Sequence, residues 1–132
     1  MDVEQRLTQY ITAVEFNDLD ALEDFYDADF VNVRYDRSGA LVTLDRDVFM
    51  GLLQSWKRDG NHPLPLATET KFITTSFFSD FAACLLLRVK GGQTLSYNMI
   101  WRRHGDTWKL AREFTFHEAL PAPTERARPS RP

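Results

Sequence analysis

The sequence predicts a single α+β domain in which three N-terminal helices cover a curved sheet. The chain has 132 residues and is 43% hydrophobic, which suits one domain with a packed core. Apolar residues recur at helical spacing in the first part of the chain, whereas the part after residue 66 has the pattern of strands. These strands are about ten residues long, and strands of this length can coil into a strongly curved sheet.

The first helix is predicted at the N-terminus. Asp2 followed by Gln5 has the form of a capping box. Behind it, one apolar stripe at helical spacing is formed by Val3, Leu7, Tyr10, Ile11 and Val14.

Two further helices follow. Asp20 is expected to cap a short second helix that ends at Tyr26. Asp45 is expected to cap a third helix, from residue 46 to about 56. Its inward side chains are expected to be Val48, Phe49, Leu52, Leu53 and Trp56.

The strands are predicted by β-forming residues between turns. Residues 30–35 and 40–44 flank an Asp-Arg-Ser-Gly turn and predict a hairpin between the second and third helices. After a loop at residues 58–65, strands are expected at 67–78, 81–89, 94–103 and 108–118. The domain is thus expected to span residues 1–118, with a disordered Pro/Arg-rich tail at 119–132.

Charge and cysteine content exclude several classes of protein. The net charge is −3, and three of the arginines lie in the tail, so an acidic domain is not expected to bind nucleic acid. The single cysteine, Cys84, lies in an apolar run and is expected to be a small buried side chain in a reducing compartment. Residues 1–6 lack the apolar core of a signal peptide, and no stretch is apolar enough to span a membrane. A cytoplasmic location is therefore expected.

The histidines and the acidic run give no metal or cofactor site. His62, His104 and His117 lie in a loop, a turn and a strand, without the spacing of metal ligands. The acidic run comprises Asp18, Asp20, Asp24, Asp27 and Asp29. It lacks the spacing of a calcium loop, so we expect helix caps and solvated side chains there.

Three groups of residues resemble a known superfamily. They are Tyr10–Val14 with Asn17–Leu22, Tyr26 and Asp29; Gly39 with Leu44–Phe49; and Gly105–Leu110. In this order they resemble the nuclear-transport-factor-2-like superfamily, especially its SnoaL-like and ketosteroid-isomerase-like members, over roughly residues 3–118. The resemblance implies a cone-shaped mixed sheet that encloses a pocket. It does not imply one function, because isomerases, cyclases, dehydratases and transport adaptors share this fold.

The resemblance also argues against one mechanism. It implies that Tyr10 takes the place of the tyrosine that holds the enolate in steroid isomerases. It sets the catalytic base near Arg34 and a second acidic donor near Met99. Arginine stays protonated and methionine has no acidic proton, so a steroid-isomerase mechanism is not expected.

The resemblance further implies which residues line the pocket. They are expected to be Tyr10, Trp56, Tyr97, Met99, Glu113 and His117, with Trp101 and Thr115 on the same face. Trp101 is expected opposite Ala111 and Tyr97 opposite Thr115, and these pairs of a large with a small side chain would leave room on that face. Trp108, Phe114 and Phe116 are then expected on the opposite face, where many members of the superfamily pair. A homodimer through that face is expected, because two phenylalanines there would form an exposed apolar patch.

Two classes of function stay open from the sequence. The first is a pocket protein that binds an apolar or aromatic small molecule without catalysis. The second is a SnoaL-like lyase, isomerase or cyclase that uses His117 or Glu113 as general base, with Tyr10 as a further catalytic residue. Glu113 and His117 are about 13 Å apart along a strand, too far for direct contact. Both can also be plain polar groups on a half-solvated strand, and Tyr10 can simply pack in the core.

Overall fold

The computed structural model describes residues 2–36, 38–60 and 67–117. The predicted tail at residues 119–132 and most of the predicted loop at 58–65 lie outside the described residues. Among the described residues, no helix is both long and apolar enough to cross a membrane.

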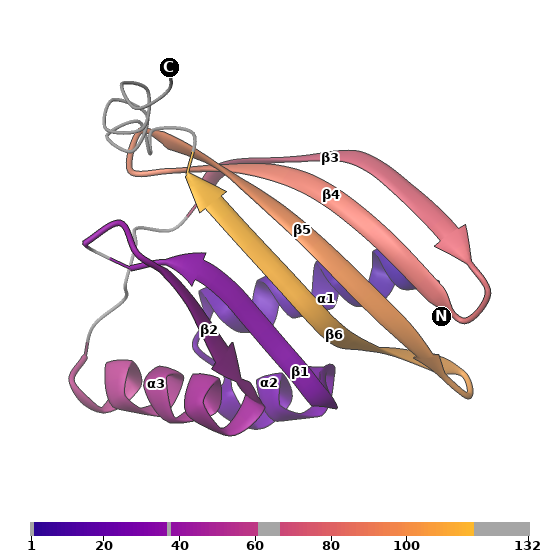
Figure 1. Cartoon of the computed structure of the whole chain (residues 1–132), viewed down its shortest axis with the longest axis horizontal. Helices are drawn as coiled ribbons and strands as arrows, with labels where there is room; N and C mark the ends of the chain where they lie inside the picture. Colours follow the sequence, from indigo (N-terminus) through magenta and orange to yellow (C-terminus); the bar gives the residue numbers. More distant parts are fainter. Residues whose placement is uncertain (1, 37, 61–66, 118–132) are drawn as a thin grey trace, which may run out of the picture.

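The elements follow one another in the order helices, hairpin, helix, strands. They are α1 (Val3–Glu15), α2 (Leu19–Phe25), β1 (Tyr26–Tyr35), β2 (Leu41–Asp45), α3 (Arg46–Arg58), β3 (Ala67–Phe78), β4 (Phe81–Lys90), β5 (Gln93–His104) and β6 (Thr107–His117). The strands form one sheet in the order β2-β1-β6-β5-β4-β3, in which only β1 and β6 run parallel. Figure 1 shows the curved sheet with α1 running behind β5 and β6 and α3 beside β1 and β2. The predicted curved mixed sheet backed by three helices is confirmed.

Side chains cap the start of all three helices. Asp2 and Gln5 form the predicted capping box of α1, and Asp45 caps α3 as predicted, accepting a hydrogen bond from the Val48 amide at 2.9 Å. The cap of α2 is Asp18 and not Asp20, because the helix begins at Leu19. Asp20 lies exposed in the first turn, where a carboxylate still favours the helix dipole.

The core lies between the helices and the concave face of the sheet. Tyr10 of α1 and Phe49 of α3 point into it as predicted, and Trp56 packs against it from α3. Cys84 is also buried there. Val48 is 54% exposed and was wrongly expected inside; it lies at the edge of the apolar stripe in the first turn of α3.

A β-bulge changes the alternation of side chains along β6. Ile100 pairs with Arg112, whereas the next residue of β5, Trp101, pairs with Leu110. Ala111 is therefore the extra residue of the bulge. A one-residue bulge interrupts the alternation of side chains. The β6 side chains that precede the bulge therefore lie on the face opposite to the one that regular alternation predicts.

Two predictions made from regular alternation are wrong for this reason. Trp108 is 2% exposed and belongs to the concave core, on the same side as Glu113, and not to the outer face. Trp101 was expected opposite Ala111 but lies opposite a leucine. After the bulge the alternation holds, and Tyr97 pairs with Thr115 as expected.

The opposite, outer face of β6 carries Phe114 and Phe116, which are half-buried. The ring of Phe116 contacts that of Tyr35 on β1, with 6.0 Å between centroids. Five exposed apolar side chains lie on the edge strand β3 and at the start of β4. They are Phe72, Ile73, Phe77, Phe78 and Phe81.

Candidate functional site

Glu113 is the centre of a buried polar cluster on the concave face. Its side chain is 3% exposed. Its Oε2 accepts a hydrogen bond from the Tyr10 hydroxyl at 2.9 Å, and its Oε1 accepts one from Asn32 Nδ2 at 2.9 Å. Tyr10 comes from the buried stripe of α1, and Asn32 lies directly opposite Glu113 in the parallel pairing of β1 with β6. Three elements that are distant in sequence thus meet at one carboxyl group.

A second layer of hydrogen bonds fixes the direction of the first. The hydroxyls of Tyr10 and Tyr26 are 3.1 Å apart, and because Tyr10 gives its proton to Glu113, Tyr26 is the donor to Tyr10. On the other side, Arg34 Nε donates to Asn32 Oδ1 at 2.7 Å, which turns the amide so that its Nδ2 faces Glu113. One series of hydrogen bonds runs from Tyr26 through Tyr10, and the other runs from Arg34 through Asn32. Both end at the carboxyl group of Glu113.

Burial and the neighbouring groups shift the pKa of Glu113 in opposite directions. Desolvation raises the pKa above its ordinary value and is the largest effect. The Arg34 charge and the hydrogen bonds from Tyr10 and Asn32 oppose this rise. The pKa of Tyr10 is raised well above its ordinary value by burial and by the Glu113 charge, so its hydroxyl stays protonated and remains a donor.

The structure brings together most of the residues predicted to line a pocket. Tyr10, Tyr97, Met99 and Glu113 all lie buried on the concave face, and Met99 pairs directly with Glu113 across β5 and β6. Trp56 packs against the same core from α3. The backbone of His117 pairs with Leu95, but its side chain lies outside the described residues, so its predicted role stays a prediction.

Two cationic side chains, Arg88 and Lys90, lie near the ring of Tyr97. The guanidinium carbon of Arg88 lies 5.6 Å from the ring centroid, and Lys90 Nζ lies 5.8 Å from it. Arg88 forms an ion pair with Glu15 of α1. Burial, followed by the Arg88 charge, lowers the pKa of Lys90 to about 8. Burial of a lysine with such a pKa costs free energy, and groups with strongly shifted pKa values are often found at functional sites.

Several buried polar atoms have no hydrogen-bond partner among the described residues. They are Arg88 Nη1, Thr115 Oγ1 and the indole nitrogens of Trp101 and Trp108. Thr115 pairs with Arg34 across β1 and β6 and with Tyr97 across β5 and β6, so its hydroxyl lies within the polar part of the concave face. Unpaired buried polar groups are few in folded proteins, and each calls for an explanation.

Asn32, Arg34 and Tyr26 were not predicted as members of this cluster, in which Asn32 bonds Glu113 directly and the other two act through Asn32 and Tyr10. From the sequence, Arg34 was considered as the position of the steroid-isomerase base, and Tyr26 as the end of the second helix and part of the resemblance. The sequence signal that could have identified the two β1 residues is their alternation: Asn32 and Arg34 are polar residues on one face of a strand rich in β-formers.

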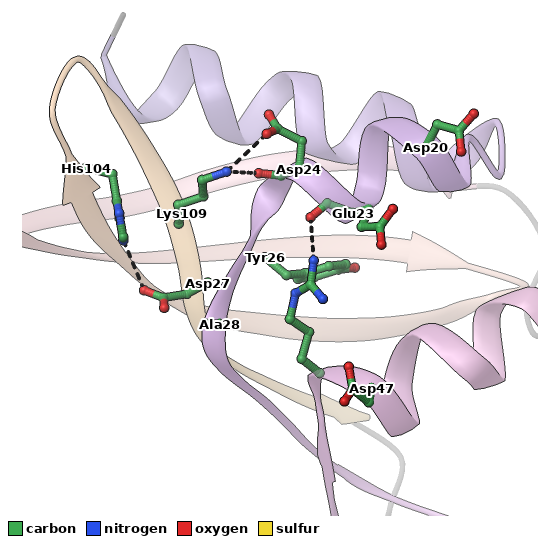
Figure 2. A pocket seen from close by; sticks show the side chains of 10 residues that line it. Asp20, Glu23, Asp24, Tyr26, Asp27, Ala28, Asp47, His104 and Lys109 are labelled. Carbon is green, nitrogen blue, oxygen red and sulfur yellow. Dashed lines mark hydrogen bonds and ion pairs between the residues drawn. The ribbon is translucent and has the colours of Figure 1, made fainter.

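A second, open site lies at the opposite end of β6, where a depression of about 730 Å³ is rich in charged side chains (Figure 2). It is lined by Asp20, Glu23, Asp24, Asp27 and Asp47, by Arg46, His104 and Lys109, and by Tyr26 and Ala28. Within the described part of the chain, no group of three or more histidine, cysteine or acidic side chains is arranged to hold a metal ion.

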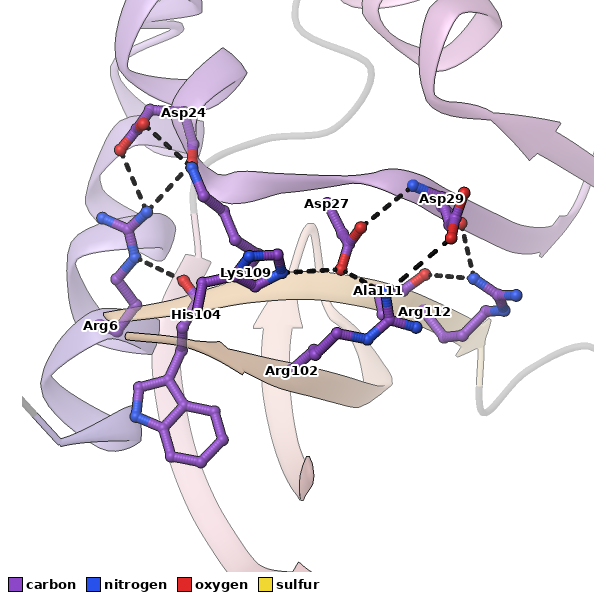
Figure 3. A network of polar contacts seen from close by, with 10 residues as sticks. Arg6, Asp24, Asp27, Asp29, Arg102, His104, Lys109, Ala111 and Arg112 are labelled. Carbon is purple, nitrogen blue, oxygen red and sulfur yellow. Dashed lines mark hydrogen bonds and ion pairs between the residues drawn. The ribbon is translucent and has the colours of Figure 1, made fainter. Parts of the chain in front are cut away.

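The two central carboxylates of this depression are already neutralised (Figure 3). Asp24 binds Arg6 at 3.2 Å and Lys109 at 3.1 Å. Asp27 binds Arg102 at 3.1 Å and His104 at 3.2 Å. This depression is therefore a network that joins α1, α2, β1, β5 and β6. We regard the concave face as the better candidate site, because buried polar atoms without a partner among the described residues lie there.

Asp27 corrects the expectation that the acidic run is solvated. It is 4% exposed. Burial raises its pKa, but hydrogen bonds from the Asp29 backbone and His104 and the charge of Arg102 outweigh that effect, so the pKa lies below its ordinary value. His104, interpreted from sequence as a turn residue, is thus also a partner of a buried carboxylate.

Comparison with solved structures agrees with this architecture. The chain is similar to a nuclear-transport-factor-2-like protein of unknown function from Silicibacter pomeroyi (TM-score 0.68, 16% identity, 89% of this chain and 100% of that one). It is equally similar to a nuclear-transport-factor-2-like protein from Cytophaga hutchinsonii (TM-score 0.68, 17% identity, 89% and 99%). A proposed dehydratase of the same family from Streptomyces avermitilis matches with TM-score 0.62, 17% identity, and 87% and 92% coverage.

These likenesses show the fold. The chain has the nuclear-transport-factor-2-like fold, as the sequence resemblance implied. No protein-family model matches it, and no curated protein matches it either.

Proposed function

We propose that this protein binds a small molecule with an apolar or aromatic body on the concave face, beside Glu113. The observation that carries this proposal is the Thr115 hydroxyl, which is buried with no partner among the described residues while the polar groups of Glu113 and Asn32 next to it are paired. A buried hydroxyl without a partner costs roughly 1–3 kcal/mol, which a bound ligand can recover.

The surroundings support a mostly apolar ligand with a few polar contacts. Tyr10, Tyr97 and Met99 give the buried concave face a mainly apolar character, and the ring of Trp56 packs on the same core. Ligand sites in proteins are mainly apolar, with a small number of placed polar groups.

A thermal-shift screen with small aromatic amides, alcohols and carboxylic acids tests the proposal. We expect members of this set to raise the melting temperature in a saturable way, since a ligand that binds only the folded state stabilises it. Thr115→Leu, which removes the hydroxyl and places a larger side chain beside Tyr97, should abolish the shift, whereas Thr43→Leu on the exposed strand β2 should not. If no compound stabilises the protein, the binding proposal is wrong.

The alternative function is catalysis, with Glu113 as general base of a lyase, isomerase or cyclase reaction. Two observations favour it: the pKa of Glu113 is raised by burial, and Tyr10 and Tyr26 supply protonated hydroxyls at the same place. The similar dehydratase from Streptomyces avermitilis is consistent with this alternative.

Hydrogen–deuterium exchange distinguishes the two functions. A base takes a proton from the carbon next to a bound carbonyl, and the bonding electrons move onto the carbonyl oxygen as an enolate. In D₂O the carbon then regains a deuteron. If Glu113 is the base, ketones that bind should exchange these protons, and Glu113→Gln should slow the exchange by about 10² or more while binding changes little. Binding without exchange would support the non-catalytic function.

Two further predictions stay proposals. We propose a homodimer formed through the outer face that bears Phe114 and Phe116, and a cytoplasmic location. The first is supported by the half-buried phenylalanines and Tyr35 on that face, and the second by the sequence alone.

A further inference from the structure

The cationic side chains Arg34 and Lys90 on the concave face have few hydrogen-bond or ion-pair partners among the described residues. Arg34 uses only Nε, in its bond to Asn32, and no hydrogen bond or ion pair engages its two terminal nitrogens within the described part of the chain. Lys90 is 9% exposed and likewise has no hydrogen bond or ion pair there. Arg88 alone is paired with a carboxylate, Glu15.

The charges in this region do not balance. The charged groups that act most strongly on Lys90 are Arg88, Glu15, Glu113 and Arg34. With Glu113 ionised, the cations exceed the carboxylates by one, and protonation of Glu113 leaves a larger excess. The whole chain carries a net charge of −3, so this local excess is opposite in sign to the protein. Arg88 and Lys90 are buried and Arg34 is half-buried. Buried charges are normally paired, because desolvation without a partner is costly.

The free donors also share one place. Thr115 and Arg34 are neighbours across β1 and β6, and Tyr97 is the neighbour of Thr115 on the other side. Lys90 lies on the same side of the sheet, because its Nζ is 5.8 Å from the centroid of the Tyr97 ring and the Arg34 charge acts on it. The guanidinium fork of Arg34 suits a planar carboxylate, and one excess positive charge suits a monoanion.

From these contacts we propose that the ligand is a small organic carboxylate. Its anionic end is held by Arg34, Lys90 and the Thr115 hydroxyl. Its apolar body lies against Tyr97 and Met99. This inference rests on the proposed binding function and adds the charge class of the ligand.

Matched pairs of acids and amides test the charge class. The probes are phenylacetate with phenylacetamide, benzoate with benzamide, and 3-phenylpropionate with its amide, titrated by calorimetry at pH 7. We expect at least one acid to bind at least about tenfold more tightly than its amide, because charge-assisted hydrogen bonds are about twice as strong as neutral ones. Lys90→Met should remove most of that preference, and Thr115→Val should weaken the acid by about tenfold. Lys71→Met and Thr43→Val, at exposed positions on β3 and β2, should change nothing.

A pH series isolates the contribution of Lys90. The ammonium is lost as the pH rises through about 8, whereas a carboxylic acid stays ionised throughout. The affinity for the acid should therefore fall above pH 8, by up to about tenfold per pH unit, whereas Lys90→Arg should lack this fall. Arg34, Arg88, Glu15 and Glu113 are unchanged in both proteins, so the difference between the two profiles belongs to position 90.

The possible results separate this inference from the binding function. Amides that bind as tightly as their acids, with no effect of Lys90→Met, would overturn the carboxylate inference and leave the binding function standing. Acids and amides that both fail to bind would overturn the two together. Tight binding of the acids with an unchanged Lys90→Met variant would overturn the role of Lys90 in holding the anion.

Discussion

Burial and hydrogen bonding shift the pKa of the Glu113 carboxyl group in opposite directions. Desolvation favours the protonated acid, whereas Tyr10, Asn32 and the Arg34 charge favour the carboxylate. Because desolvation is the larger effect, the folded protein binds this proton more tightly than the unfolded chain. The stability that the proton on Glu113 contributes to the fold is therefore fully present below the ordinary glutamate pKa of 4.5. This contribution is lost as the pH rises through the raised pKa.

Glu113→Gln should remove this pH dependence. Glutamine cannot titrate, yet it can accept a hydrogen bond from Asn32 and donate one to the Tyr10 oxygen. We expect the free energy of unfolding of the variant, relative to the native protein, to increase as the pH rises from about 4.5 into the neutral range. Urea unfolding at a series of pH values measures this difference. A difference that stays constant or decreases with pH would contradict the raised pKa.

Tyr10→Phe should destabilise the protein more than an ordinary loss of a hydroxyl. The change removes the donor to Glu113 and the acceptor of the Tyr26 hydroxyl, and leaves two buried groups unpaired. The expected loss in free energy of unfolding is about 1–3 kcal/mol. Tyr35→Phe is the matched control, because the Tyr35 hydroxyl has no hydrogen bond within the described part of the chain. Equal losses for the two variants would show that the Tyr10 hydroxyl contributes nothing specific.

At the scale of elements, α3 is held at its start by one side chain. Asp45 Oδ1 accepts from the Val48 amide at 2.9 Å, and it is also the last residue of β2. Asp45→Ala should lower the free energy of unfolding by about 0.5–2 kcal/mol, whereas Asp45→Asn, which can still cap, should cost little. Denaturant unfolding of both variants measures the effect. If asparagine costs as much as alanine, the carboxylate charge and not the cap is what matters.

The elements themselves were predictable from local sequence. The helix caps, apolar stripes and turns indicated the order of helices and strands, since each depends on residues close together in the chain. The bulge at Ala111 was not predictable, because nothing in the residues around it marks an extra residue in a strand. It depends on how β6 meets β5, and it reversed the expected face of Trp108.

The site was predictable only in part for a related reason. Tyr10, Tyr97, Met99 and Glu113 followed from the resemblance together with regular alternation after the bulge. The bond from Asn32 to Glu113 joins residues 81 apart, through a parallel pairing of β1 and β6 that local patterns do not encode. Lys90 was missed because the strand was expected to end at residue 89, with Lys90 in the turn that follows. In the structure β4 runs to Lys90, which lies on the same face as the buried Leu86 and Arg88.

At the scale of the molecule, the outer face of the sheet bears the proposed dimer interface. Sedimentation at micromolar concentration should give about twice the chain mass of 15.3 kDa. Phe114→Glu should shift the protein to monomer, because a carboxylate would be desolvated in the interface. Phe16→Glu is the control, since Phe16 is 78% exposed at the end of α1. A native monomer, or a dimer that Phe114→Glu leaves intact, would contradict the proposed interface.

The central claim is that a ligand occupies the concave face beside Glu113 and not the open charged depression at the other end of β6. Amide NMR of the protein titrated with phenylacetate tests it most directly. We predict saturable shifts of the amide signals of Tyr97, Glu113 and Thr115, with those of Asp24 and Lys109 unchanged. Shifts confined to Asp24 and Lys109, or no saturable shift at all, would contradict the claim.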